Sequence, residues 1–416
     1  MTTKILTFLV VSAFAVISCK NNDSDTGTDP VAVDTTTIPG SILPVETNRA
    51  NSSYTPSFAG QTRIAGVKSA TAFEGRILTS NLSSPWGITT LPDGRLLITQ
   101  KGGTMRIATT AGALSQPITG LPAVNSAGQG GLLGVRVDPS FSANRMIYWI
   151  FSESTADGNL TSVAKGRLTE DETRIENAIV IYRALPAYRG TLHYGGRILF
   201  DRNGNLLVST GERSDNAVRT QAQSLNSGLG KIVRISKEGQ PVAGNPFAGQ
   251  ADARPEVYSL GHRNPQGLAI HPVTGDLWQT EHGPRGGDEL NRVEAGKNYG
   301  WPTITYGLEY SGAAVGTAIQ RRDGMEQPAY YWDPVVSPSG ITFYSSDSIP
   351  EWKNNLFIGS LSGQHIVRLV ITDNKVTGEE RLLASENQRF RDITQGNDGA
   401  LYAVTDAGRL YRIFKR

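Results

Sequence analysis

The chain has 416 residues, and its 40 lysine and arginine residues against 38 aspartate and glutamate residues leave a net charge of +2. A protein that wraps nucleic acid needs a strong positive field, so this balance argues against nucleic acid as a partner. Charged residues form only 19% of the chain, whereas 46 glycine and 21 proline residues indicate many turns. This composition argues against a coiled coil and favours a turn-rich globular fold.

The first residues are typical of an export signal. Lys4 precedes the apolar residues 5–18, a stretch too short to span a bilayer but suited to a signal-peptide core. It ends in Val16-Ile17-Ser18-Cys19, which resembles the bacterial lipobox, and Cys19 is the only cysteine. We predict a lipoprotein signal peptide over 1–18, a lipid on Cys19, and an exported bacterial lipoprotein of the cell envelope that meets the membrane only through this anchor. The alternatives are an ordinary signal peptide with an incidental cysteine and a weak membrane anchor.

The next segment lacks the pattern of a folded element. Residues 21–51 are rich in Asn, Asp, Ser, Thr and Pro and show no hydrophobic periodicity, as is typical of a flexible segment. We therefore predict a flexible tether over 19–70 and a folded domain over 71–416. Because the chain has a single cysteine, a metal in this domain needs oxygen or histidine ligands.

A unit of two apolar runs joined by a turn recurs six times in the folded domain. The copies cover 86–100, 131–152, 196–212, 267–281, 340–360 and 392–406. In four copies a glycine in the turn suits the positive φ of a hairpin, and the flanking apolar residues alternate with period 2. These turns are Asp93-Gly94, Asn203-Gly204, Thr274-Gly275 and Asp398-Gly399. Each copy is therefore predicted to be a β-hairpin.

Single hairpins bury too little surface to be stable alone. Packing several four-stranded units around an axis buries both faces of each sheet, which is the architecture of a propeller. We predict an all-β fold, a six-bladed β-propeller of four-stranded antiparallel blades, with functional loops on one face. A multi-sheet sandwich of similar strands is the alternative.

His193 directly precedes Tyr194-Gly195-Gly196 at the start of the third repeat. Two glycines let the chain approach a ligand closely, and an imidazole exchanges protons near neutral pH. His193 is therefore our candidate general base. A histidine that only satisfies a turn is the alternative.

Residues 261–267, Gly-His-Arg-Asn-Pro-Gln-Gly, place a cation and an amide in one turn before the fourth repeat. Arg263 and Asn264 can hold planar carboxylate or quinone oxygens through several hydrogen bonds. A turn stabilised by this Arg–Asn pair is the alternative, although Pro265 already fixes the turn.

Residues 281–289, Glu-His-Gly-Pro-Arg-Gly-Gly-Asp-Glu, combine a flexible backbone with carboxylates, as a Ca²⁺ loop of oxygen ligands requires. The carbonyls of Gly283 and Pro284 and the carboxylate of Glu289 are candidate ligands. A metal-free turn of the same composition is the alternative.

Arg389 and Arg391 are two residues apart in an extended segment, so their side chains lie on one face before the last repeat. Two cations on one face indicate a bound anion. A surface position, or a cap on Asp392, is the alternative.

Three segments in chain order carry a family resemblance, and they are Gly261–Pro272, Glu281–Asn291 and Asn298–Pro302. With them, residues 82–412 resemble the soluble quinoprotein sugar dehydrogenases, the glucose/sorbosone dehydrogenase family, and in particular its aldose sugar dehydrogenase branch. That family carries pyrroloquinoline quinone on a six-bladed propeller. The resemblance implies an oxidoreductase, dependent on this quinone (PQQ) and on Ca²⁺, that oxidises aldose sugars at C1 to the lactone.

The resemblance also implies a role for each site residue. His193 would take the proton of the C1 hydroxyl while hydride passes to C5 of the quinone, and Gln129 would contact the substrate. Arg263 and Asn264 would hold the quinone oxygens, and Arg263 would also polarise the quinone carbonyl. Arg389 and Arg391 would bind the carboxylates of the cofactor. The carbonyls of Gly283 and Pro284 would bind the Ca²⁺ beside the cofactor. Glu289 and the carbonyl of Tyr299 would bind a structural Ca²⁺.

Two positions depart from the glucose-oxidising branch, which has an Asp before the catalytic histidine and a Lys after the Ser-Leu pair of the fifth blade. This chain has Leu192 at the first position and, near Ser360-Leu361, Ser362 and Gln364 at the second. We therefore expect a broad range of aldose substrates, with an unidentified electron acceptor as a further partner. Two other functions stay open, a Ca²⁺-dependent propeller hydrolase or lactonase and a non-catalytic propeller that binds glycans or proteins.

Overall fold

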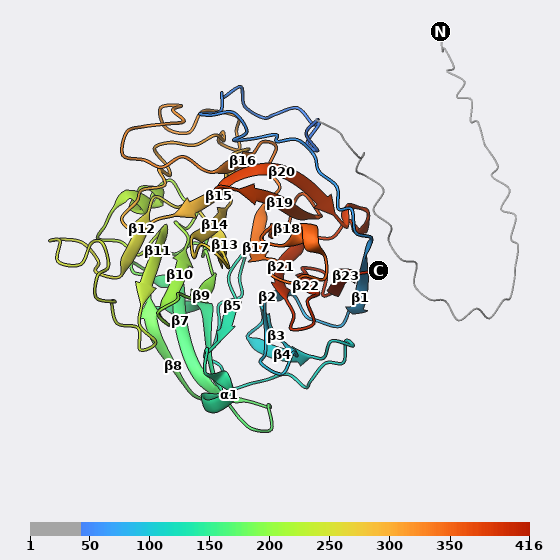
Figure 1. Ribbon diagram of the computed structural model, residues 1–416. Coiled ribbons are helices and arrows are strands. Elements are labelled where there is room, and N and C mark those ends of the chain that lie inside the picture. The colour runs from blue at the N-terminus through green and yellow to red at the C-terminus, as the bar shows by residue number, and fades with distance from the viewer. Residues whose placement is uncertain (1–42) are drawn as a thin grey trace, which may run out of the picture. The chain divides into compact units, whose positions relative to one another are not determined.

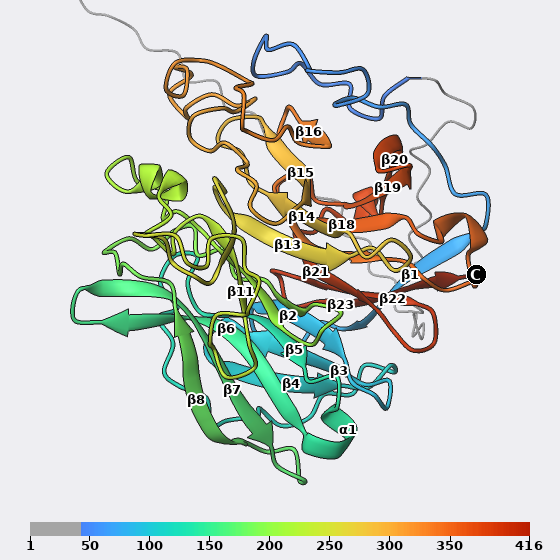
Figure 2. The ribbon, with the colours of Figure 1, turned by 60° about the vertical axis from the view of Figure 1, so that its left-hand side comes forward.

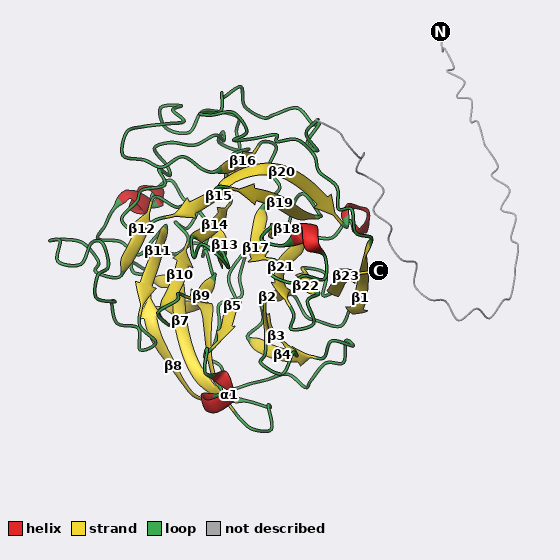
Figure 3. Ribbon diagram, in the orientation of Figure 1, coloured by secondary structure: helices red, strands yellow, loops and turns green. Residues whose placement is uncertain are grey.

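Six antiparallel sheets follow one another around a centre in the computed structural model of the protein, which describes residues 43–416 (Figure 1). The predicted all-β, six-bladed propeller is confirmed. Strands form nearly all the regular structure of the described residues (Figure 3). The exceptions are one short helix, α1 (Phe141–Asn144), and three 3₁₀ turns, Arg219–Gln223, Pro350–Trp352 and Ala384–Glu386.

The blades are numbered here along the chain. Blade 1 consists of β2 (Pro85–Thr90), β3 (Leu96–Gln100) and β4 (Thr104–Ala108). Blade 2 consists of β5 (Leu132–Val137), β6 (Met146–Thr155), β7 (Gly158–Leu168) and β8 (Ile175–Arg183). Blade 3 consists of β9 (Ile198–Phe200), β10 (Leu206–Thr210), β11 (Lys231–Ile235) and β12 (Val257–Leu260).

Blades 4 to 6 complete the ring. Blade 4 consists of β13 (Pro265–Ile270), β14 (Leu277–Glu281), β15 (Asp288–Val293) and β16 (Tyr330–Trp332). Blade 5 consists of β17 (Pro338–Phe343), β18 (Leu356–Ser360), β19 (Ile366–Thr372) and β20 (Lys375–Leu382). Blade 6 consists of β21 (Phe390–Gln395), β22 (Leu401–Thr405), β23 (Leu410–Lys415) and β1 (Phe73–Thr79).

The first two strands of every blade coincide with the six predicted hairpins. In the four turns that carry a glycine, Gly94, Gly204, Gly275 and Gly399 have φ between +77° and +88°, as a tight hairpin turn needs. The first strand of each blade contacts the first strands of the two neighbouring blades, so these six strands surround the centre of the ring (Figure 1).

The last blade joins the two ends of the described chain. Strand β1 pairs antiparallel with β23, from Phe73 opposite Lys415 to Thr79 opposite Leu410. The ring is therefore closed by backbone hydrogen bonds between segments far apart in the sequence, and β1 becomes the outer strand of the last blade.

Blade 1 differs from the prediction of four strands, because only three pair in a continuous sheet. Leu114 and Ile118 make isolated bridges to Ala108 and Met105 of β4, where a fourth strand would lie. Pro117 stands between them, and a proline cannot donate to the ladder. The fourth strand is thus reduced to two bridges.

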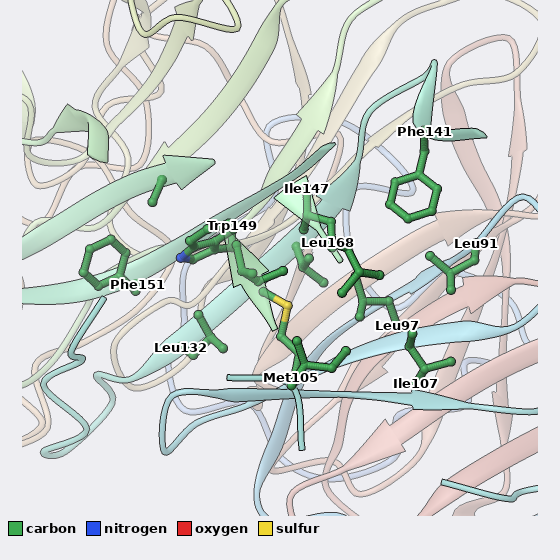
Figure 4. Close-up of a cluster of buried hydrophobic side chains, with 14 residues drawn as sticks. Leu91, Leu97, Met105, Ile107, Leu132, Phe141, Ile147, Trp149, Phe151 and Leu168 are labelled. Carbon is green, nitrogen blue, oxygen red and sulfur yellow. The ribbon is translucent and has the colours of Figure 1, made fainter. Parts of the chain in front are cut away.

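Apolar side chains fill the spaces between neighbouring blades. Between blades 1 and 2, Leu97, Met105 and Ile107 pack against Ile147 and Trp149 (Figure 4). Both faces of a blade are covered in this way, which explains why strands such as β3 and β10 are buried at every position.

Residues 43–70, called the strap below, differ from the predicted tether because they pack on blades 4 and 5 (Figure 2). Gln61 is fully buried, its Nε2 donates to the carbonyl of Pro328 at 3.0 Å, and its own carbonyl accepts from the amide of Tyr331 at 2.8 Å. The amide of Val67 donates to the carbonyl of Glu379 at 2.9 Å. The composition of these residues predicts flexibility, but in the structure they form hydrogen bonds with the propeller.

The strap's anchors in blade 4 centre on Asp333. Its two carboxylate oxygens accept hydrogen bonds from the amides and side chains of Asn51 and Ser52, at 2.8 to 3.0 Å. Cys19 and the predicted signal peptide lie outside the described residues. No helix within residues 43–416 is long and apolar enough to cross a membrane.

Candidate active site

The first strands of the blades begin, and their second strands end, around a cavity of about 550 Å³. Every blade contributes to the wall of this cavity. The contributions are Trp86 and Lys101 from blade 1, Gln129 from blade 2, His193 from blade 3, Arg263 and Pro284 from blade 4, Leu361 from blade 5, and Arg391 and Asp406 from blade 6. Of the residues singled out in the sequence, Gln129, His193, Arg263, Gly283, Pro284, Arg389 and Arg391 line this cavity. Asn264, Glu289 and Tyr299 do not line it.

His193 is held in the wall by two neighbours. Its backbone amide donates to Oε1 of Gln129 at 2.9 Å, and its Nδ1 lies 2.6 Å from Oε1 of Glu212. Its φ of +45° is in the left-handed region, which is rare outside glycine and often marks functional sites. With Glu212 accepting the Nδ1 proton, the lone pair lies at Nε2, which has no hydrogen-bond partner among residues 43–416.

Electrostatics keep this histidine neutral. Burial, together with repulsion from Arg263 and Arg213, holds the pKa of His193 well below its usual range. Burial also raises the pKa of Glu212 to about 7, against the opposing effect of Arg263. A neutral imidazole at pH 7 can take up a proton, as a general base must.

The two glycines after His193 serve a different purpose from the one expected. Gly195 and Gly196 have φ of +66° and +108°. A Cβ at Gly195 would meet backbone atoms of Thr210, and one at Gly196 would meet Leu133 of blade 2. These glycines permit close packing of neighbouring strands, and they do not line the cavity.

Arg263 spans the floor between two blade-4 loops. Its Nη1 donates to the carbonyls of His282 and Gly283 at 3.0 and 2.7 Å, and its guanidinium lies 5.0 Å from the centre of the Trp301 ring. Its Nε is buried without a partner among the described residues. A group with an acceptor oxygen would satisfy this nitrogen.

Asn264 lies behind the wall. Its Oδ1 accepts from the amide of Gly195 at 3.0 Å, and its Nδ2 lies 3.3 Å from Nδ1 of His282. Asn264 therefore connects the His193 turn to His282, which does line the cavity. Nε2 of His282 is a second buried nitrogen without a partner in the described part of the chain.

Lys101 of blade 1 and Arg389 and Arg391 of blade 6 form one side of the cavity, called the cationic wall below. Asp406 binds Arg389 through Nε at 2.8 Å and Arg391 through Nε and Nη2 at 2.8 and 3.0 Å. Lys101 lines the same cavity. Three cations thus surround one carboxylate, which leaves an excess of positive charge for an anionic ligand.

The metal residues predicted from the 281–289 loop separate into two places. Gly283 and Pro284 line the main cavity, where Asp288 accepts the amide of Gly283 at 2.8 Å. Glu289 instead lines a small pocket of about 10 Å³ with Glu281. Within residues 43–416 no group of three or more His, Cys, Asp and Glu side chains could hold a metal, so a metal here would need backbone carbonyls.

Glu281 and Glu289 lie directly opposite each other on β14 and β15. Burial and repulsion by Glu281 raise the pKa of Glu289 well above its usual range. Two buried carboxylates facing each other fit a cation between or beside them. The ring of Tyr299 stacks on His262 at 4.9 Å, and Nδ1 of His262 in turn lies 3.1 Å from Oε1 of Glu281. The carbonyl of Tyr299 accepts no hydrogen bond from the described residues.

Sequence reasoning missed the cavity-lining residues Lys101, His282 and Asp406, and it missed Glu212, which is bonded to His193. One of them had a signal in the repeats. His193 and Glu212 are 19 residues apart and bonded, and the next repeat holds His262 and Glu281 at the same spacing, with Nδ1 to Oε1 at 3.1 Å. A histidine at the start of one repeat and a glutamate at its end is therefore a recognisable pattern.

Comparisons with known proteins identify the family of this chain. The family described as glucose/sorbosone dehydrogenase matches residues 82–412. Aldose sugar dehydrogenase YliI of Escherichia coli K12 is 41% identical over 345 residues, which are 82% of this chain and 92% of that protein.

Solved structures of similar proteins share the fold. The soluble aldose sugar dehydrogenase of Escherichia coli in its apo form is 39% identical, with a TM-score of 0.79 over 83% of this chain and 100% of that chain. The PQQ-bound form of aldose sugar dehydrogenase from Streptomyces coelicolor is 27% identical, with a TM-score of 0.69 over 83% of this chain and 99% of that chain. Because the family match spans most of the propeller and the YliI relative covers four fifths of the chain, the protein belongs to the glucose/sorbosone dehydrogenase family.

Proposed function

We propose that the protein is a quinoprotein aldose sugar dehydrogenase, which oxidises aldose sugars at C1 to the lactone with PQQ and Ca²⁺ as cofactors. The relatives support this class of reaction, since they include aldose sugar dehydrogenases and a PQQ-bound structure. The observation that carries the proposal is that His193, bonded to Glu212, lines a cavity rich in cationic side chains.

His193 acts as the general base. Glu212 fixes the Nδ1 proton, so Nε2 is the atom that accepts the proton of the C1 hydroxyl as hydride leaves C1. Gln129 lines the same wall beside His193. Its Nε2 has no partner among the described residues, which leaves it available to a sugar hydroxyl.

The cavity fits PQQ by charge and by its unsatisfied donors. The carboxylates of the cofactor match the cationic wall of Arg389 and Arg391, and its quinone oxygens match Arg263, whose Nε is buried without a described partner. When bound, the quinone supplies the hydride acceptor at its C5, and Ca²⁺ supplies a charge that polarises the quinone carbonyl. Asn264 supports this wall from behind through His282.

The family resemblance implies two Ca²⁺ positions. The carbonyls of Gly283 and Pro284 would hold the ion beside the cofactor, and Glu289 with the carbonyl of Tyr299 would hold a structural ion. The facing carboxylates of Glu281 and Glu289 support the second position. Gly283 O already accepts Arg263 Nη1, but a carbonyl has a second lone pair for a metal.

A broad range of aldoses is the proposed substrate class. Leu192 directly precedes the base in the chain, is 40% exposed outside the cavity lining, and has no polar side-chain atom with which to select a sugar hydroxyl. A site with fewer buried polar groups discriminates less between sugars that differ in one hydroxyl.

Reconstitution tests the proposal. Apoprotein with Ca²⁺ and PQQ is assayed for dye reduction with a panel of aldoses, and the products are identified. We expect lactone or aldonate from several sugars. His193→Gln lowers the rate about 10² to 10⁴-fold while PQQ still binds, and His271→Gln, in a distant turn, serves as the control. Lactone hydrolysis without PQQ, or near-normal dye reduction by His193→Gln, contradicts the proposal.

A further inference from the structure

Lys101 occupies a fixed place at the cationic wall. It follows β3, and its backbone amide donates to the carbonyl of Ser84 at 3.0 Å while its carbonyl accepts from the amide of Leu132 at 3.0 Å. A Cβ at Gly131 would collide with the Lys101 carbonyl, so only a glycine there allows this close approach. Both the start of blade 1 and the start of blade 2 therefore position Lys101.

The ammonium of Lys101 has no carboxylate partner among residues 43–416. Its Nζ donates to the carbonyl of Gly128, a neutral acceptor, and an ammonium carries three protons. The nearby carboxylate of Asp406 is already engaged at both oxygens by Arg389 and Arg391.

The charges of Arg391 and Asp406 nevertheless affect the pKa of Lys101. Burial and repulsion from Arg391 lower the pKa of Lys101, and Asp406 acts in the opposite direction. Lys101, Arg389 and Arg391 against Asp406 leave an excess of two positive charges at this wall. Such an excess at one end of a cavity is suited to a ligand with more than one carboxylate.

We propose that Lys101 is a third cationic anchor for the carboxylates of the quinone cofactor, beside Arg389 and Arg391. This inference rests on the proposed function. The proposed anchor directly follows β3, the second strand of blade 1. At the equivalent position of blade 5, after β18, the cavity is lined by the apolar Leu361. The competing explanation is that Lys101 only supports the loop of Gly128 through its Nζ bond.

Binding of PQQ to the apoprotein separates the two explanations. The dissociation constant is measured by calorimetry in the presence of Ca²⁺ for wild type, Lys101→Gln, Lys101→Arg and Arg391→Ala. The control is Lys353→Gln, because Lys353 pairs with Asp347 on the surface and does not line the cavity. Thermal unfolding of each apoprotein, without quinone, reports the structural effect of each change.

We expect Lys101→Gln to weaken PQQ binding roughly tenfold, as loss of one charge-assisted contact does. The dependence of its affinity on ionic strength also falls, whereas Lys101→Arg retains most of the affinity and Lys353→Gln binds as wild type does. Unchanged affinity of Lys101→Gln, with or without a lower Tm, overturns the anchor but leaves the proposed function intact. Absence of PQQ binding by wild type instead overturns the proposed function, and the anchor with it.

Discussion

The contact between His193 and Glu212 decides which nitrogen of the histidine can act. An ionised Glu212 accepts the proton of Nδ1 at 2.6 Å and leaves Nε2 as a base. A protonated Glu212 would donate to Nδ1 instead, which would place the imidazole proton on Nε2 and block it. The activity of His193 therefore depends on the charge of its neighbour.

This dependence predicts a pH profile. Because the pKa of Glu212 is raised to about 7 while that of His193 is held well below its usual range, kcat falls as the pH is lowered through about 7. Glu212→Gln removes this titration, so its profile is flat across pH 6 to 8 at a lower rate. Stopped-flow rates of quinone reduction against pH check the prediction, and Glu238→Gln, with a side chain 69% exposed, is the control. A wild-type profile that is flat across the same range would contradict it.

At the scale of elements, the strap shows how polar residues outside the blades acquire a structural role. Ser52 Oγ donates to the carbonyl of Tyr306 at 3.3 Å, and Arg285 Nε donates to Oδ1 of Asn51 at 3.2 Å. Arg285 follows Pro284 of the cavity wall. The strap precedes the family-matched residues 82–412, yet it contacts the loop that carries two candidate Ca²⁺ ligands.

The strap gives a stability prediction. Asp333→Ala removes the acceptor of four hydrogen bonds from Asn51 and Ser52, and hydrogen bonds to a charged group contribute about 1.5 to 3 kcal/mol. We expect a lower Tm and faster proteolytic cleavage within residues 43–56. Asp347→Ala, with a side chain 81% exposed, is the matched control. Protease resistance equal to wild type in Asp333→Ala would show that the strap is held by other contacts.

At the scale of the whole molecule, a bound cation would stabilise the facing carboxylates of Glu281 and Glu289, because without it burial and their repulsion raise the pKa of Glu289. Glu281 and Glu289 face each other with Asn291 Nδ2 between them, at 3.2 and 3.1 Å. Removal of a ligand that binds only the folded state lowers stability by mass action, by about 2.7 kcal/mol when the ligand was at a hundred times its Kd.

We therefore expect exhaustive chelation to lower the Tm of the protein, and readdition of Ca²⁺ to restore it. The loss is smaller in Glu289→Gln, which has already lost one carboxylate of the pair. Metal analysis before and after chelation confirms removal of the ion. An unchanged Tm in metal-free wild type would argue against the structural Ca²⁺ site.

The lipid anchor on Cys19 is the other prediction that concerns the molecule as a whole. Mass spectrometry of protein extracted from bacterial membranes should detect a mature N-terminus at a diacylglycerol-modified Cys19. Cys19→Ser, which keeps the size of the side chain but removes the thiol, releases the protein from the membrane fraction. An unmodified N-terminus after residue 19 in the wild-type protein would refute the anchor.

The sequence by itself determined the blades. Period-2 alternation and the glycines of turns such as Asp93-Gly94 act locally, so six hairpins could be recognised without a structure. The same local signals marked the turns of His193 and Arg263 as candidate sites. The composition of the strap predicted a flexible segment, whereas the structure shows it packed. The composition could not reveal this, because the partners of residues such as Asn51 lie about 280 residues away in the chain.

Only the tertiary structure decided which of these residues share a wall. Lys101 and Asp406 come from opposite ends of the propeller sequence and meet because β1 and β23 close the ring. Asn264 and Tyr299 stand in marked turns, yet packing places them behind the cavity. Distance in space and burial, and with them charge balance and pKa, depend on how the six blades pack together, and no local pattern of residues contains that information.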